Sequence, residues 1–195
     1  MKVWHIDSSA RNEQSQSKRL TKKFVDTLAQ KTTIESDVLD VSAGLPFLND
    51  LMVGSYFTPD EHRTDEQKAV LEPSNRIVES AKESDVWVMG VPVYNFFAPA
   101  SFKAFIDLLC RAKETFYYSE NGPVGLLENK KVFVVIASGG TQIGSEQDFL
   151  TPWLTHCLNF VGVKDVQFIN ADQYTPEKEE AINQQIEAMT SELAK

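Results

Sequence analysis

Apolar residues follow two kinds of pattern along this chain, and the first kind predicts buried strands. Residues 85–91 and 131–137 are almost continuously apolar, as is typical of strands covered on both faces of a parallel sheet. Residues 2–7 predict a first strand and residues 165–170 a last one. Residues 34–41 alternate with polar positions, so we expect this strand to lie nearer a sheet edge.

The segments between these strands have the second pattern, the spacing of amphipathic helices. Leu20, Phe24, Val25 and Leu28 form one apolar stripe, and the opposite face is charged. Further helices with such a stripe are expected over residues 101–111, 149–161 and 176–193.

Strands and helices therefore alternate five times, which predicts an α/β fold with a doubly wound parallel sheet in three layers. Five strands in 195 residues favour the order 2-1-3-4-5 of flavodoxin-like sheets. The length fits a single domain, which we expect to cover residues 1–195.

Three stretches are less regular. Residues 44–48 and 53–57 carry large apolar side chains without a clear period, so we expect a loop packed over the sheet. Residues 64–82 have a helical composition, which Pro73 is expected to kink or split. Residues 115–126 predict a hairpin, because an aromatic run is joined by Asn-Gly to a second short run.

The net charge is -9 and basic residues form no block, which argues against binding to nucleic acid or to anionic membranes. A bound phosphate would have to be held by local donors rather than by the overall field. No apolar segment approaches the roughly 18 residues of a membrane span, and nothing at the start of the chain predicts a signal peptide.

The only cysteines, Cys110 and Cys157, are far from any Cys-x-x-Cys spacing. A disulfide framework or a cysteine zinc site is therefore not expected, and a reducing cytoplasm fits best.

The loops after the first, third and fourth strands should meet at the carboxyl edge of such a sheet. The first loop offers Ser9, Ser15, Gln16 and Ser17 at the start of a helix, where free N–H groups and the helix dipole attract a phosphate. The alternative is that Ser15 or Ser17 simply caps the helix, which is the commoner role of a serine there.

The other two loops suit a flat polar heterocycle. Tyr94, Asn95 and Phe96 follow Pro92 and could present backbone groups to a ring edge and an aromatic to its face, although a packed surface loop is an equal alternative. Gly139-Gly140 would let the backbone approach a ligand, although a plain turn is the commoner meaning of this pair. Three such loops at one edge favour a ligand site together.

Several familiar sites are missing from the sequence. There is no Gly-x-Gly-x-x-Gly after the first strand, no P-loop and no Gly-x-Ser-x-Gly elbow. His5, His62 and His156 have no partners at metal-ligand spacing, so we expect no metal site and structural or surface roles for all three.

The motifs together resemble the FMN-dependent NADH azoreductases, also described as FMN-dependent NADH:quinone oxidoreductases. The resemblance spans almost the whole chain. It rests on Ser8-Ser9, Ser15-Gln16-Ser17, Pro92-Val93-Tyr94-Asn95-Phe96, Thr115-Phe116, Tyr118 to Pro123, Gly125-Leu126, Gly139-Gly140 and Phe160-Val161-Gly162-Val163. Two positions depart from the family pattern: Val93 stands where methionine is common, and Ser138 where an arginine often precedes the glycines.

The resemblance implies bound FMN, a homodimer with the flavin near the subunit interface, and a substrate pocket bordered by Tyr118 and Phe160. It implies that the phosphate is held by Ser9, Ser15, Gln16 and Ser17. The isoalloxazine ring would lie against Val93, Tyr94, Asn95, Phe96, Ala137, Ser138, Gly139 and Gly140.

The activity implied is two-electron reduction of quinones and azo compounds by NADH or NADPH in a ping-pong reaction. FMN itself carries the hydride, so no catalytic side chain is expected. Two alternatives stay open: a flavodoxin-like electron carrier without a substrate pocket, and an interaction module of the same fold without a cofactor.

Overall fold

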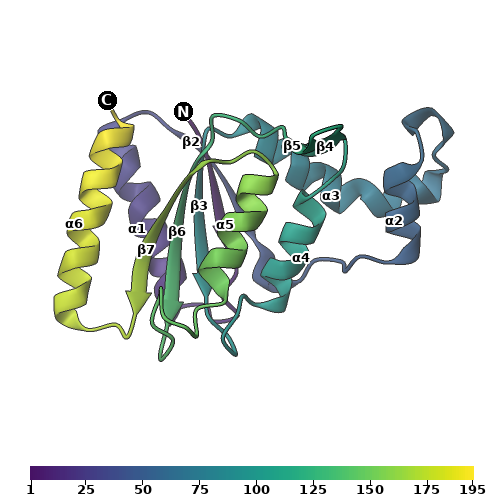
Figure 1. The fold of residues 1–195 in the computed structure, drawn as a ribbon. Helices are drawn as coiled ribbons and strands as arrows, with labels where there is room; N and C mark the ends of the chain where they lie inside the picture. The colour runs from purple at the N-terminus through teal and green to yellow at the C-terminus, as the bar shows by residue number, and fades with distance from the viewer.

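A parallel sheet of five strands forms the centre of the molecule in the computed structural model, which describes residues 1–195 (Figure 1). Its spatial order is β2-β1-β3-β6-β7, and every neighbouring pair is parallel. Counted along the chain this is the order 2-1-3-4-5, so the flavodoxin-like prediction is confirmed. The strands are β1 (Lys2–Asp7), β2 (Glu35–Asp40), β3 (Val86–Pro92), β6 (Lys131–Ser138) and β7 (Asp165–Asp172).

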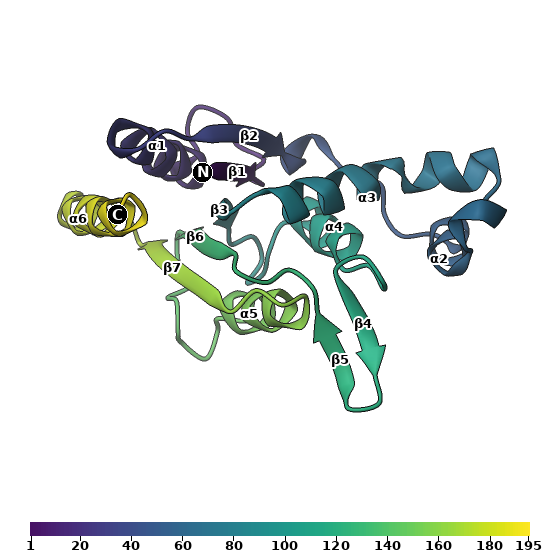
Figure 2. The same cartoon turned by 90° about the horizontal axis from the view of Figure 1, so that it is seen from above.

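Helices cover both faces of this sheet and complete three layers (Figure 2). One face carries α1 (Gln16–Lys31) and α6 (Pro176–Leu193). The other carries α3 (Asp65–Glu83), α4 (Ala100–Leu109) and α5 (Leu150–Phe160). None of the helices combines the length and the apolar character that crossing a membrane requires.

Successive side chains of each strand point to opposite faces, which divides the apolar residues into two cores. Trp4 and Trp87 pack edge to face in the core below α3 and α4, with ring centroids 5.4 Å apart. Phe24 of α1 packs on Phe133 of β6 in the other core, at 4.8 Å. Every residue of β3 is buried, whereas β2 is mostly exposed, as its edge position requires.

The expectation of a loop over residues 53–57 is wrong, because they belong to the helix α2 (Asp50–Phe57). Asn49 caps this helix by accepting a hydrogen bond from the Met52 N–H at 2.9 Å. Met52 is fully buried, but several of the helix's other apolar side chains are exposed, which is why no amphipathic period marks it. Short 3₁₀ turns lie on either side, at Val41–Ala43 and Asp60–His62.

Helix α3 runs unbroken across Pro73, so the helix is not split. A capping box of Thr64 and Gln67 starts it, and Leu71 and Ile77 bury one face on either side of the proline. These contacts outweigh the single hydrogen bond that the proline removes.

The predicted hairpin is present as β4 (Phe116–Ser119) and β5 (Gly122–Gly125). It lies at the amino end of the sheet, beside the end of α5 (Figure 1). There Gly125 faces Gly162 so closely that an added Cβ would be 2.1 Å from the Gly162 nitrogen. Close backbone packing therefore explains why glycine occupies position 125.

Candidate functional site

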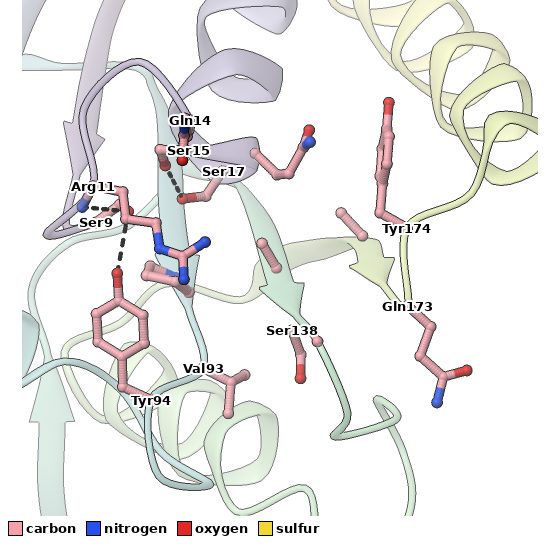
Figure 3. A pocket seen from close by; sticks show the side chains of 15 residues that line it. Ser9, Arg11, Gln14, Ser15, Ser17, Val93, Tyr94, Ser138, Gln173 and Tyr174 are labelled. Atoms are coloured by element: carbon pink, nitrogen blue, oxygen red, sulfur yellow. Dashed lines mark hydrogen bonds between the residues drawn. The ribbon is translucent and has the colours of Figure 1, made fainter.

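A cavity of about 500 Å³ opens at the carboxyl edge of the sheet, among the loops that follow β1, β3, β6 and β7 (Figure 3). It brings together most of the residues that the sequence predicts for the cofactor. Those that line it are Ser9, Ser15, Gln16, Ser17, Val93, Tyr94, Ala137, Ser138 and Gly139. Asn95, Phe96 and Gly140 lie on the same loops, next to the lining residues but not among them.

The start of α1 forms one wall and offers hydrogen-bond donors. Ser15 is the N-cap, and its hydroxyl accepts from the Lys18 N–H at 3.2 Å, so the capping interpretation is right for this serine. The next two N–H groups, of Gln16 and Ser17, have no acceptor in the protein. The hydroxyls of Ser15 and Ser17 lie 3.2 Å apart. Capping leaves the free N–H groups of the first turn available to an anion.

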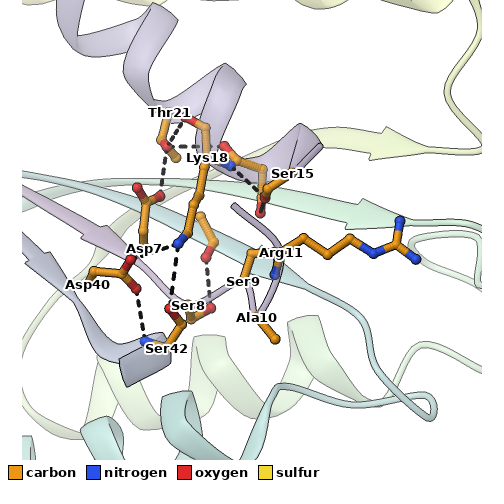
Figure 4. A network of polar contacts seen from close by, with 12 residues as sticks. Asp7, Ser8, Ser9, Ala10, Arg11, Ser15, Lys18, Thr21, Asp40 and Ser42 are labelled. Carbon is orange, nitrogen blue, oxygen red and sulfur yellow. Dashed lines mark hydrogen bonds and ion pairs between the residues drawn. The ribbon is translucent and has the colours of Figure 1, made fainter. Parts of the chain in front are cut away.

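A buried polar network fixes this helix to β1 (Figure 4). The Thr21 hydroxyl donates to Asp7 Oδ1 at 2.9 Å, and His5 Nε2 lies 2.9 Å from the same hydroxyl and 3.3 Å from Asp7 Oδ2. Gly90 on β3 leaves room for this carboxylate, because a Cβ there would be 2.8 Å from Asp7 Oδ1. His5 is thus part of the core behind the cavity.

Tyr94 links the loop after β3 to the loop after β1. Its hydroxyl lies 3.3 Å from Ser9 Oγ and accepts from the Ala10 N–H at 3.2 Å. Tyr94 and Phe97 exchange both backbone hydrogen bonds, at 2.9 and 3.1 Å, across a two-residue turn. Asn95 and Phe96 adopt φ values of 51° and 68° in this turn, and their N–H groups have no acceptor.

The loop after β6 has unoccupied space beside its two glycines, Gly139 and Gly140. Ser138 Oγ accepts from the Thr141 N–H at 2.8 Å and more weakly from that of Gly140 at 3.3 Å, whereas the Gly139 N–H has no acceptor. A Cβ added at Gly139 or Gly140 would meet no atom within 4 Å. These glycines therefore leave empty space that the protein itself does not fill.

Asp148 anchors the far side of this loop. Its carboxylate accepts from the N–H groups of Gly144, Leu150 and Thr151 at 2.9 to 3.1 Å. Burial alone would raise the pKa of Asp148, but the hydrogen bonds from Thr151, Gly144 and Leu150 together hold that pKa below its usual value. The loop is thus tied down by an ionised side chain.

The sequence interpretation missed several lining residues, namely Arg11, Gln14, Pro92, Ala171, Gln173 and Tyr174. The last three belong to the end of β7 and the loop after it, where the Gln173 N–H donates to the Ser138 carbonyl at 2.8 Å. The predicted strand order already placed the end of the last strand beside that of the fourth, so this order could have indicated them.

Tyr118 and Phe160 do not meet the cavity of their own chain. They belong to the cluster at the amino end of the sheet, where Phe116 packs on Phe160 at 4.4 Å and on Tyr118 at 5.5 Å. Phe160 ends α5 just before the chain enters β7, so it lies at the end of the strands opposite to the cavity (Figure 1). Tyr118 is 72% exposed.

Comparison with known proteins agrees with this geometry. The family model described as "Flavodoxin-like fold" matches residues 1–193. The chain is 43% identical to FMN-dependent NADH:quinone oxidoreductase 1 of Hahella chejuensis, across 99% of this chain and 97% of that protein. It is 40% identical to the protein of the same name from a Jannaschia species, across 97% and 98%.

Among solved structures, the chain is similar to an FMN-dependent NADH-azoreductase from Bacillus anthracis in complex with FMN. The TM-score is 0.89 at 23% identity, across 100% of this chain and 99% of that one, which supports the fold. The identities of 43% and 40% to the two relatives show the family as well as the fold. The chain belongs to the family of FMN-dependent NADH:quinone oxidoreductases.

Proposed function

We propose that this protein is an FMN-dependent oxidoreductase that uses NADH to reduce quinones and azo compounds. The observation that supports this most directly is a cavity at which the start of α1 and the loop after β6 leave N–H groups without acceptors, at Gln16, Ser17 and Gly139. Unpaired donors beside a cavity are expected where a ligand supplies the missing acceptors.

The residues present fit FMN. The phosphate would be held at the start of α1 by the N–H groups of Gln16 and Ser17 and by the hydroxyls of Ser9 and Ser15. The Ser17 hydroxyl already lies 3.2 Å from that of Ser15, whereas the Ser17 N–H has no acceptor in the protein, so the N–H is the donor left for a ligand.

The ring would lie between the loops after β3 and β6. The empty space at Gly139 and Gly140 lets a flat ring approach the backbone, and the Gly139 N–H would donate to a polar atom at its edge. Val93 and Tyr94 would border the ring from the other side.

FMN, when bound, supplies the transfer of two electrons from a nicotinamide donor to an acceptor. The chain's contribution is to orient the ring and to leave one of its faces accessible. Donor and acceptor would use the same open side in turn, in a ping-pong sequence, and no side chain has to exchange a proton with them. The two free thiols suit a reducing cytoplasm.

The substrate pocket would be completed by a second copy of the chain. Tyr118 and Phe160 can border a pocket only in this way, because they lie at the opposite end of the sheet from their own cavity. Other large apolar side chains are also exposed, among them Phe57 at 73% and Phe47 at 69%. A homodimer would cover such surfaces.

The first test is to purify the protein and record its visible spectrum. An enzyme of this kind should carry flavin absorbance that NADH bleaches directly, and a quinone or an azo dye should restore it. Comparing NADH with NADPH would establish the preferred donor. Flavin that needs a separate reductase would identify an electron carrier instead, and colourless protein that takes up no FMN would contradict the proposal.

A second test concerns the shared pocket. Gly140→Val would break the cavity of one copy, and Tyr118→Ala would remove the aromatic that the other copy supplies. If each pocket combines two copies, refolding the two weak variants together should restore activity, because half of the pockets in a hybrid dimer are then intact. Mixtures no more active than the separate variants would show that the pocket lies within one chain.

A further inference from the structure

Arg11 lies on the loop after β1 and lines the cavity, yet its guanidinium makes no ion pair or hydrogen bond within the protein. Figure 3 shows the side chain reaching from its loop toward the space between Ser17 and Val93. A guanidinium has five N–H donors and stays charged at all ordinary pH values. Arg11 therefore presents an uncompensated positive charge to the cavity.

The other cations near the start of α1 are already paired. Lys18 Nζ lies 2.7 Å from Asp40 Oδ2, and Arg19 Nη1 lies 2.7 Å from Glu179 Oε1. Figure 4 shows Lys18 turned toward Asp40 while Arg11 extends in another direction. Arg11 is thus the one cation of this region whose charge is free to meet a ligand.

A charged donor would strengthen phosphate binding at this site. The chain has a net charge of -9, so the overall field opposes a dianion. Free N–H groups at a helix start carry only about half a unit charge.

We propose that Arg11 binds the phosphate of FMN and makes the site select the phosphorylated flavin over riboflavin. This inference rests on the proposed function. Two N–H groups of a guanidinium match two phosphate oxygens, which a lysine cannot reproduce. The loop is also held in place, because the Arg11 N–H donates to Ser9 Oγ at 3.2 Å and Ser9 in turn contacts Tyr94.

The test is to prepare the full-length apoprotein and titrate it with FMN and, separately, with riboflavin. Arg11→Gln removes the charge and keeps a polar side chain. Arg11→Lys keeps the charge but lacks the paired N–H donors of the planar guanidinium. Lys22→Gln is the matched control, since it removes one charge from α1, the helix that follows the Arg11 loop, at an exposed position paired with Asp26.

We expect Arg11→Gln to raise the Kd for FMN about 10- to 100-fold, the range of a charged hydrogen-bonded contact, and to change the Kd for riboflavin less than about twofold. Arg11→Lys should recover part of the affinity, and Lys22→Gln should match the unchanged protein. The dependence of FMN binding on salt concentration should weaken in Arg11→Gln.

Equal losses for both flavins, or no loss for either, would overturn the assignment of Arg11. An unchanged Kd for FMN with a raised KM for NADH would also overturn it, because Arg11 would then bind the donor's phosphates. A wild-type chain that binds neither flavin would instead refute the proposed function and this inference with it. The two failures are therefore distinguishable.

Discussion

The two ends of the sheet use their backbone groups in opposite ways. At the amino end, the Leu127 N–H donates to the Val161 carbonyl at 2.8 Å, and Gly125 lies against Gly162. At the carboxyl end, N–H groups such as those of Gln16 and Gly139 have no acceptor, and the space beside Gly139 is empty. The backbone groups named at the amino end are bonded within the protein, whereas those named at the carboxyl end are left free to bond a ligand.

Glycine is required for different reasons at the two ends of the sheet. At position 125 any side chain would collide with backbone atoms, so glycine is needed for folding. At positions 139 and 140 a side chain would collide with nothing in the protein, so glycine is needed only if something else occupies the space. Substitutions at the two ends should therefore separate stability from binding.

Gly125→Ala should have the largest effect. Its Cβ would lie 2.1 Å from the Gly162 nitrogen and 2.3 Å from the Val161 carbonyl carbon, and backbone atoms cannot move aside cheaply. We expect a loss of more than about 4 kcal/mol in the free energy of unfolding, or no folded protein, measured by urea denaturation.

The matched control for this variant is Gly54→Ala. Position 54 lies within α2 with no atom within 4 Å of a new Cβ, so this change should stabilise the protein by about 0.5 to 1 kcal/mol. Equal stability of the two variants would mean that the hairpin does not pack on α5 as described.

Gly140→Val should have the second largest effect, and this effect should be on FMN binding and not on stability. We expect at least a 100-fold rise in the Kd for FMN, about 2.7 kcal/mol, with a free energy of unfolding of the apoprotein within about 1 kcal/mol of wild type. Fluorescence titration and denaturation measure the two quantities separately. A variant that keeps its full complement of flavin would show that the loop after β6 is not part of the site.

Asp148→Ala should lower the free energy of unfolding by about 1 to 3 kcal/mol near neutral pH. The reason is that three backbone N–H groups at the far side of the loop after β6 lose their acceptor. The pKa of Asp148 is lower in the folded than in the unfolded chain, whose value is about 3.9. Its contribution to stability is therefore present above that value and is lost as the pH falls through the folded pKa.

The gap in stability between wild type and Asp148→Ala should accordingly shrink in acid, as denaturation at a series of pH values can show. Asp148→Asn, which keeps an oxygen acceptor but no charge, should lose less at neutral pH. A gap that stays constant down to the most acid pH tested would argue against an ionised anchor.

Tyr94→Phe should have the smallest effect, since it removes one part-exposed hydroxyl that joins the loops after β1 and β3. We expect the free energy of unfolding to fall by about 0.5 to 1.5 kcal/mol and the amide hydrogen of Ala10 to exchange faster. Tyr117→Phe is the control, because the Tyr117 hydroxyl makes no hydrogen bond in the protein. Equal exchange in both variants would show that Tyr94 does not hold the loop.

Much of the fold and part of the site could be predicted from sequence because periodicity reports burial directly. The unbroken apolar run of β3 predicted a strand covered on both faces, and the order of elements predicted which loops meet. Helix α2 was missed because it buries Met52 and little else that is apolar, so its pattern shows no helical face.

Other parts of the site depend on information that a pattern does not contain. The cavity residues after β7, such as Gln173 and Tyr174, belong to an irregular segment without a motif, so only the predicted strand order, and no local pattern, could have indicated them. Which N–H groups lack acceptors depends on how loops far apart in the chain are bonded to one another. The resemblance suggested Tyr118 and Phe160 as pocket residues, but only the fold shows their distance from the cavity of their own chain.

Both chain termini lie at the amino end of the sheet (Figure 1), since β1 starts there and α6 returns there. The six residues of β1 separate this end from the cavity by about 20 Å. A tag, a fluorophore or a link to an electrode attached at either terminus would therefore point away from the cavity. The protein could be immobilised by either end with its cavity still facing the solution.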